Sequence, residues 1–198
     1  MNEYRVDLHI HTCLSPCGSL EMSPERIVDT ALAQGLDAIA ITDHNSTLQC
    51  PAIQALGKER GLTVFAGAEV TTREEAHCVA LFADDEARAA FQEYLDAHLP
   101  PVPNDPERFG DQVWVNSQGE ILGEAPYLLI SALDQRVEQI AAEEAAMAGP
   151  EAPEEQPVRL TPEEELDRNP ISIQINGQWQ TFPNAAAAEE GQHRRGWL

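Results

Sequence analysis

The chain has 198 residues, 42% of them hydrophobic, which favours one domain or one domain with an appendage. Its 34 acidic residues outnumber 12 lysines and arginines, and the formal net charge of −22 excludes tight, non-specific binding to long nucleic acid or to an anionic membrane. No apolar run reaches the roughly 18 residues of a membrane span, and no signal-peptide core is present, so we expect a cytoplasmic protein.

Strands and helices are expected to alternate over the first hundred residues. Ser23 followed by Pro24 predicts a helix start, and Gly35 predicts its end. The expected strands are 5–10, 38–42, 62–66 and 77–82, and the expected helices are 24–34, 51–61 and 85–98. This order predicts an α/β fold with parallel strands, in which the chemistry lies at the C-terminal ends of the strands.

The pattern changes after residue 100. Residues 112–115 and 120–122 flank Asn-Ser-Gln-Gly and predict a hairpin, and Ser131 is expected to cap a helix that runs to about Met147. Residues 149–170 are rich in proline and glutamate, which predicts a solvated linker. Two further strands are expected around the turn signal Asn176-Gly177. The predicted units are 1–141, 142–170 and 171–198.

The end of the first strand carries two histidines one residue apart, His9 and His11. Residues i and i+2 of a strand point to the same face, so both imidazoles can approach one metal ion. Three more potential ligands, His44, Glu69 and His77, follow at the ends of later strand-like runs. Together they make the chain a candidate metalloenzyme.

These motifs resemble the PHP (polymerase and histidinol phosphatase) family of metal-dependent phosphoesterases. The matching stretches are Asp-Leu-His-Ile-His-Thr (7–12), Ile-Thr-Asp-His-Asn (41–45), Gly-Ala-Glu-Val-Thr-Thr (67–72) and the strand that begins at His77. The resemblance covers about residues 3–140. It implies a distorted (β/α)7 barrel with two or three divalent metal ions, of Zn, Mn, Fe or Mg, at the C-terminal ends of its strands.

The resemblance also implies a role for each matching residue. His9 and His11 resemble the ligands of a first ion, Glu69 the carboxylate that bridges two ions, and His77 a ligand of the second. His44 resembles a ligand of the third ion, with Asp43 beside it as an orienting partner. The expected catalytic residues are Asp43, His44 and Glu69, and Asp7 is expected to support the histidine pair.

The implied reaction is hydrolysis of a phosphate monoester by metal-activated water. The expected substrate is small and phosphorylated, a nucleotide or a short oligonucleotide end, and a histidinol-phosphate-like metabolite is the alternative. Bound cations neutralise the phosphate, which reconciles an anionic substrate with so acidic a chain.

Two departures from the family pattern leave alternatives open. Many members carry Asp-Gly shortly after the histidine pair, and in them this Asp helps to bind the third ion. Cys17 is the nearest ligand-capable residue here, so the third site is either softer, with Cys17 as a ligand in place of Asp, or absent. The later family motifs, a His or Cys and then Asp-X-His, are absent, because His98 is interpreted as a helix-end residue and His193 as part of a weak tail. The barrel is therefore expected to be incomplete. The chain is then a truncated, catalytically silent metal-binding remnant, or a second chain of a homo-oligomer supplies ligands, or the N-terminal ligands with water suffice.

Overall fold

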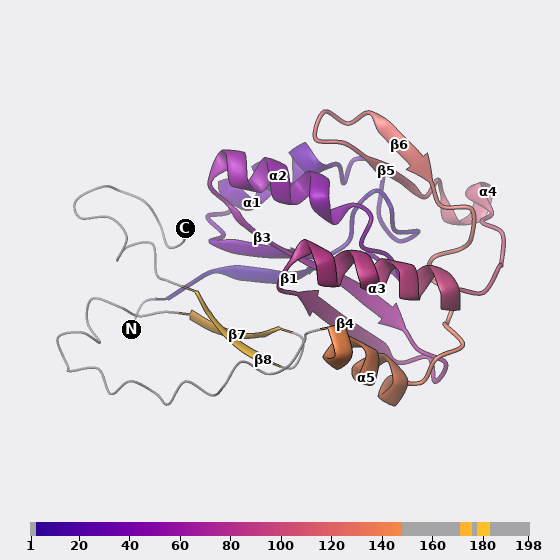
Figure 1. The fold of residues 1–198 in the computed structure, drawn as a ribbon. Helices are drawn as coiled ribbons and strands as arrows, with labels where there is room; N and C mark the ends of the chain where they lie inside the picture. Colours follow the sequence, from indigo (N-terminus) through magenta and orange to yellow (C-terminus); the bar gives the residue numbers. More distant parts are fainter. Residues whose placement is uncertain (1–2, 148–170, 176–177, 183–198) are drawn as a thin grey trace, which may run out of the picture.

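The computed structural model describes residues 3–147, 171–175 and 178–182, and a four-stranded sheet lies at its centre (Figure 1). The strands are β1 (Val6–Ile10), β2 (Ala38–Ile41), β3 (Thr63–Thr71) and β4 (His77–Phe82), in the order β1-β2-β3-β4. β1, β2 and β3 are parallel, as predicted, whereas β4 runs antiparallel to β3. Because β1, β2 and β3 are parallel, their C-terminal ends lie together at the same end of the sheet.

Helices connect the strands, and those expected over 24–34, 51–61 and 85–98 form close to the predicted positions. They are α1 (Pro24–Ala33), α2 (Cys50–Arg60), α3 (Asp85–His98), the short α4 (Pro106–Phe109) and α5 (Val137–Met147). The Ser23 hydroxyl accepts a hydrogen bond from the Arg26 backbone amide, as expected of an N-cap. Gly61 ends α2 in the left-handed conformation, with φ of 80°.

The two faces of β3 have different environments. Ala66 packs with α1 and α2, while Ala68 and Val70 pack with α3 and α5, so the even-numbered side chains face the helices. Phe65 belongs to a separate cluster on the opposite face. By strand alternation Glu69 shares the Phe65 face, so its carboxylate points away from the helical layer.

A hairpin of β5 (Val113–Val115) and β6 (Ile121–Glu124) follows α4, as predicted. The segment after it packs Ala125 and Leu129 against Leu14, which lies in the loop after β1. This packing covers the loop that follows the two histidines and holds it in place.

The distal strands also form as predicted. β7 (Ile171–Ile175) pairs antiparallel with β8 (Gln178–Phe182). The turn between them, the linker at 149–170 and His193 lie outside the described residues. The expected unit boundaries therefore stay predictions.

The expected helix start at Ser131 is wrong. α5 begins only at Val137, because the preceding segment bonds to the core as an irregular loop. The Leu133 amide donates to the Thr71 carbonyl, and Asn45 donates to the Ser131 carbonyl, which keeps the segment out of a helix. The sheet is open across the described strands, so a complete (β/α)7 barrel is not confirmed. Among the described helices, none combines the length and apolarity needed to cross a membrane.

Candidate metal centre

Four histidines converge on the carboxylate of Glu69. Its Oε2 lies 2.9 Å from His11 Nε2, 3.2 Å from His9 Nε2 and 3.3 Å from His44 Nδ1. Its Oε1 lies 2.8 Å from His77 Nδ1. The structure therefore brings together all five residues that the sequence singled out as metal ligands.

Each residue owes its place to the sheet. His9 lies in β1 and His11 directly follows it, while His44 lies beyond the end of β2 and forms an isolated bridge with Glu69. The Glu69 amide donates to the Asp43 carbonyl at 3.0 Å, which extends the pairing of β2 and β3 past the last regular residue of β2. On the other side, His77 pairs with Thr71 in the antiparallel register, two residues from Glu69.

Asp43 lies behind the histidines and faces away from solvent. Its carboxylate accepts hydrogen bonds from the Thr12 amide at 2.7 Å, the Thr12 hydroxyl at 2.8 Å and the Ser15 hydroxyl at 2.7 Å. Burial raises the pKa of Asp43, and these three donors oppose the rise. Asp43 therefore holds the loop after β1 in place, which fits the orienting role expected for it.

Asp7 lies beside the histidine pair and contacts the backbone of His9. Its Oδ1 accepts a hydrogen bond from the His9 amide at 3.2 Å. The contact lies at an irregularity in the pairing of β1 with β2, between Asp7 and Ile10. The interaction fixes the backbone from which the His9 imidazole projects.

Sequence reasoning missed Asn45 as an organising residue. Its side-chain amide donates to the carbonyls of Leu129 at 2.6 Å and Ser131 at 2.8 Å, and its Oδ1 accepts from the Thr71 amide. Its φ of 44° is in the left-handed region, which asparagine tolerates better than most residues. An asparagine directly after the Asp-His pair was the available signal.

The electrostatics of the cluster favour the metal-binding protonation states. Burial lowers the pKa of His44 to about 4 and also lowers the pKa of His11. Burial alone raises the pKa of Glu69, but the surrounding histidines outweigh it and hold that pKa below its usual range. At neutral pH His44 and His11 are neutral and Glu69 is charged, which is the form in which these groups bind metal ions.

Three overlapping sets of side chains have the ligand spacing for a divalent cation. Within each set the ligand atoms lie within 4.8 Å of one another; the sets are His9, His11 and Glu69; His44, Glu69 and His77; and His11, Cys17 and His44. Imidazole and carboxylate together suit Zn²⁺, Mn²⁺ or Fe²⁺. The residues present therefore fit the divalent ions that the sequence predicted, with Glu69 common to the first two sets.

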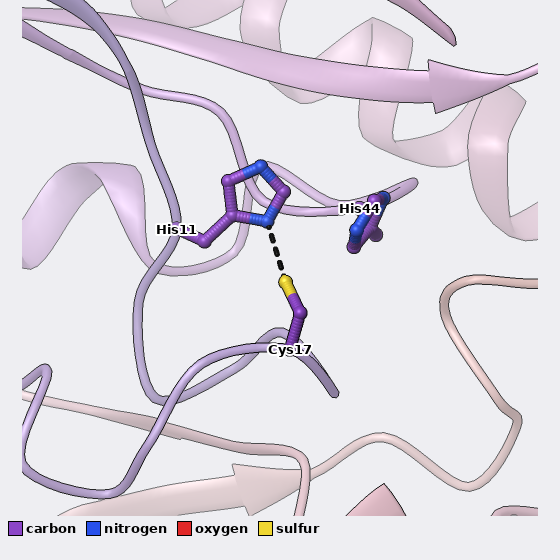
Figure 2. Close-up of side chains that lie close together, drawn as sticks. All are labelled: His11, Cys17 and His44. Atoms are coloured by element: carbon purple, nitrogen blue, oxygen red, sulfur yellow. Dashed lines mark hydrogen bonds between the residues drawn. The ribbon is translucent and has the colours of Figure 1, made fainter.

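The remaining cysteines and His98 lie outside these sets. Cys13 and Cys50 are buried free thiols and Cys78 is half-buried, as expected of small packing residues. Cys17, by contrast, belongs to the third set. It is exposed, and its Sγ lies 3.0 Å from His11 Nδ1 (Figure 2). His98 is the last residue of α3, as predicted, and pairs with Asp134.

Curated relatives share parts of the chain. A PolC-type DNA polymerase III of Oceanobacillus iheyensis is 42% identical over 65 residues, which are 33% of this chain and 4% of the polymerase. An uncharacterized protein of Methanocaldococcus jannaschii is 34% identical over 91 residues, 41% of this chain and 52% of that protein. A 5′-3′ exoribonuclease of Haemophilus influenzae is 34% identical over 71 residues, 36% of this chain and 25% of that enzyme. The matches thus span about half or less of each relative.

Solved structures show a weaker likeness. An amidohydrolase from Chromobacterium violaceum gives a TM-score of 0.38 at 28% identity, over 46% of this chain and 32% of that one. A protein assigned as a metal-dependent phosphoesterase from Bifidobacterium adolescentis gives 0.40 at 20% identity, over 74% of this chain and 51% of that one. Both TM-scores are below 0.5.

The decisive similarity is to the PHP domain, which matches residues 7–151. That match spans well over half of the chain and includes all five converging residues and Cys17. This chain belongs to the PHP domain family.

Proposed function

We propose that the chain is a metal-dependent phosphoesterase that hydrolyses a phosphate monoester at the Glu69 cluster. The observation that carries the proposal is the convergence of His9, His11, His44 and His77 on the single carboxylate of Glu69. Membership of the PHP domain family supports a hydrolase, and the donor set supports divalent cations as its cofactors.

The residues divide into holding and positioning groups. His9, His11 and Glu69 would hold one ion, and His44, Glu69 and His77 a second, with Glu69 shared between them. Divalent ions in such a pair lower the pKa of water and offset the charge of a phosphoryl group. Asp43 keeps the loop after β1 in register, so that His11 and His44 stay aimed at Glu69.

The exposure of the ligands supports access by a substrate from solvent. The side chains of His9 and His77 are 49% and 45% exposed, whereas that of Glu69 is 8% exposed. Glu69 is thus buried while His9 and His77 are open to solvent, which suits a phosphate that approaches from the exposed side. We propose the terminal phosphate of a nucleotide or short oligonucleotide, since relatives are named as a polymerase and an exoribonuclease.

The net charge of −22 favours a short substrate over long nucleic acid. A direct test reconstitutes metal-free protein with Mn²⁺ or Zn²⁺ and measures phosphate release from a panel. The panel contains 4-nitrophenyl phosphate, nucleoside monophosphates and bisphosphates, and 5′-phosphorylated oligonucleotides, with a phosphodiester as the comparison.

We expect the wild type to release phosphate from the monoesters only when metal is bound, and we expect Glu69→Gln to abolish this release. Background rates across the whole panel, in protein shown to contain metal, would identify a silent metal-binding protein instead. Preferential cleavage of the diester would overturn the assignment of a monoester substrate.

A further inference from the structure

A sulfur donor lies next to the Glu69 cluster. Cys17 Sγ is 3.0 Å from His11 Nδ1 (Figure 2), and a ring nitrogen of His44 completes a set whose ligand atoms lie within 4.8 Å of one another. The other two sets of potential ligands include Glu69, whereas this one contains two imidazoles and a thiol. Thiolate with imidazole favours softer cations such as Zn²⁺, while carboxylate and water favour Mg²⁺ and Mn²⁺.

We propose that Cys17, His11 and His44 bind a Zn²⁺-like cation through the Cys17 sulfur, beside the positions that share Glu69. The inference deepens the metal centre proposed above and rests on it. It gives the protein two chemically different classes of cation site within one cluster.

His44 supplies evidence that is independent of the cysteine. The residue is only 4% exposed, and its Nδ1 makes no hydrogen bond within the described part of the chain, although Glu69 Oε2 lies 3.3 Å away. A buried polar atom without a partner costs free energy, so native structures rarely keep one. Coordination of a cation by the His44 ring, in this set or in the set with Glu69 and His77, removes that cost.

The orientation of His11 fits the same arrangement. Its Nδ1 faces Cys17, while its Nε2 lies 2.9 Å from Glu69 Oε2. Histidines that bind a metal through one ring nitrogen usually donate the other N–H to a carboxylate or carbonyl. A neutral imidazole has one lone pair, so His11 binds either a cation at Nδ1 together with Cys17 or a cation at Nε2 together with His9 and Glu69, and these two sets are alternatives.

The loop that carries Cys17 is rigidly built. The Ser15 hydroxyl binds Asp43, and the Gly18 amide donates to the Ser15 carbonyl at 2.9 Å. A Cβ added to Gly18 would lie 2.0 Å from the Thr12 carbonyl oxygen, so the loop closes tightly on itself. Cys17 is therefore held at His11 by the fold of the loop, while its own exposure leaves the sulfur reachable from solvent.

Cobalt absorption tests the proposal directly. Metal-free full chain is titrated with Co²⁺, and a sulfur-to-cobalt charge-transfer band is sought in the near ultraviolet. We expect the band in the wild type and in Cys78→Ser, which changes a half-buried cysteine outside the cluster. Cys17→Ser should lose the band while it still binds cobalt through the sets that contain Glu69.

Alkylation provides a second measurement that does not depend on spectroscopy. Zn²⁺ should slow the reaction of Cys17 with iodoacetamide by roughly tenfold or more, and it should leave the reaction rate of Cys78 unchanged. Protein that binds cobalt without the charge-transfer band would overturn this inference and leave the Glu69 positions standing. Protein that binds no cobalt at all would overturn both this inference and the proposed function.

Discussion

Glu69 Oε2 lies 2.9 Å from His11 Nε2, although β2 separates the strands from which the two residues come. The approach is possible because His11 follows the last residue of β1 and Glu69 lies in the part of β3 that extends beyond β2. The cluster thus forms where strands of unequal length end, and it depends on the register of the whole sheet.

Replacement of Glu69 by glutamine keeps the shape of the side chain and removes its charge. Since Glu69 is shared by two of the three ligand sets, we expect Mn²⁺ affinity to fall by roughly 100-fold or more. Isothermal titration of metal-free protein measures the change. Glu93→Gln, at an exposed position on α3, is the matched control and should bind as the wild type does. Equal Mn²⁺ affinity in the two variants would show that Glu69 is not a metal ligand.

Asp43→Asn tests the buried support behind the histidines. Asparagine offers one acceptor oxygen where Asp43 accepts three hydrogen bonds, so at least one buried donor loses its partner. We expect the free energy of unfolding to fall by about 2–3 kcal/mol and metal affinity by roughly tenfold or more. Urea denaturation of the metal-free protein and metal titration measure the two effects. The exposed Asp111→Asn should change neither, and a fully stable Asp43→Asn would contradict the supporting role.

The low pKa of His44 predicts how stability depends on pH. Burial lowers this pKa to about 4, from an ordinary value near 6.5, so the unfolded chain binds the proton more readily than the folded one. In metal-free protein His44 should therefore contribute a loss of stability as pH falls from about 6.5 towards 4, and the lowered pKa of His11 acts in the same direction.

His44→Gln isolates that contribution from the other titrating groups. Thermal unfolding with chelator present, from pH 7.5 to 5, should show the melting temperature of the wild type falling relative to that of the variant. The comparison matters because protonation of the many carboxylates also changes the net charge. Parallel pH profiles for the two proteins would show that His44 titrates normally.

Gly18→Ala tests the tight loop between the histidine pair and α1. Its new Cβ meets the backbone carbonyl of Thr12, which cannot move without disturbing the hydrogen bonds to Asp43. We expect a loss of about 1–3 kcal/mol in the free energy of unfolding. Gly119→Ala, in the turn of the β5–β6 hairpin, has open space and a positive φ, so it should cost about 1 kcal/mol and spare the metal centre.

The two glycine variants are distinguished by metal binding. Gly18→Ala should weaken Zn²⁺ binding because it displaces Cys17, and Gly119→Ala should not. Similar Zn²⁺ affinity in both would show that the loop is free to adapt.

Local sequence patterns were enough to predict much of this fold. Ser23 caps α1 and Gly61 ends α2 because these roles depend on neighbouring residues alone. The histidine pair and Glu69 were found because parallel strands bring their C-terminal ends together. Ser131 misled because the hydrogen bonds of its segment go to Asn45 and Thr71, which are distant in the sequence. The antiparallel direction of β4 likewise follows from the short connection after Thr71 rather than from the composition of the strand.

If the cluster around Glu69 holds divalent cations, the protein carries them when it is purified, so its metal content is the measurement to make first. Protein purified without chelator is analysed by plasma mass spectrometry, together with His9→Ala. We expect about two ions per chain in the wild type and fewer in the variant. Wild-type protein that carries no bound metal, and takes up none on dialysis against Zn²⁺ or Mn²⁺, would contradict this expectation.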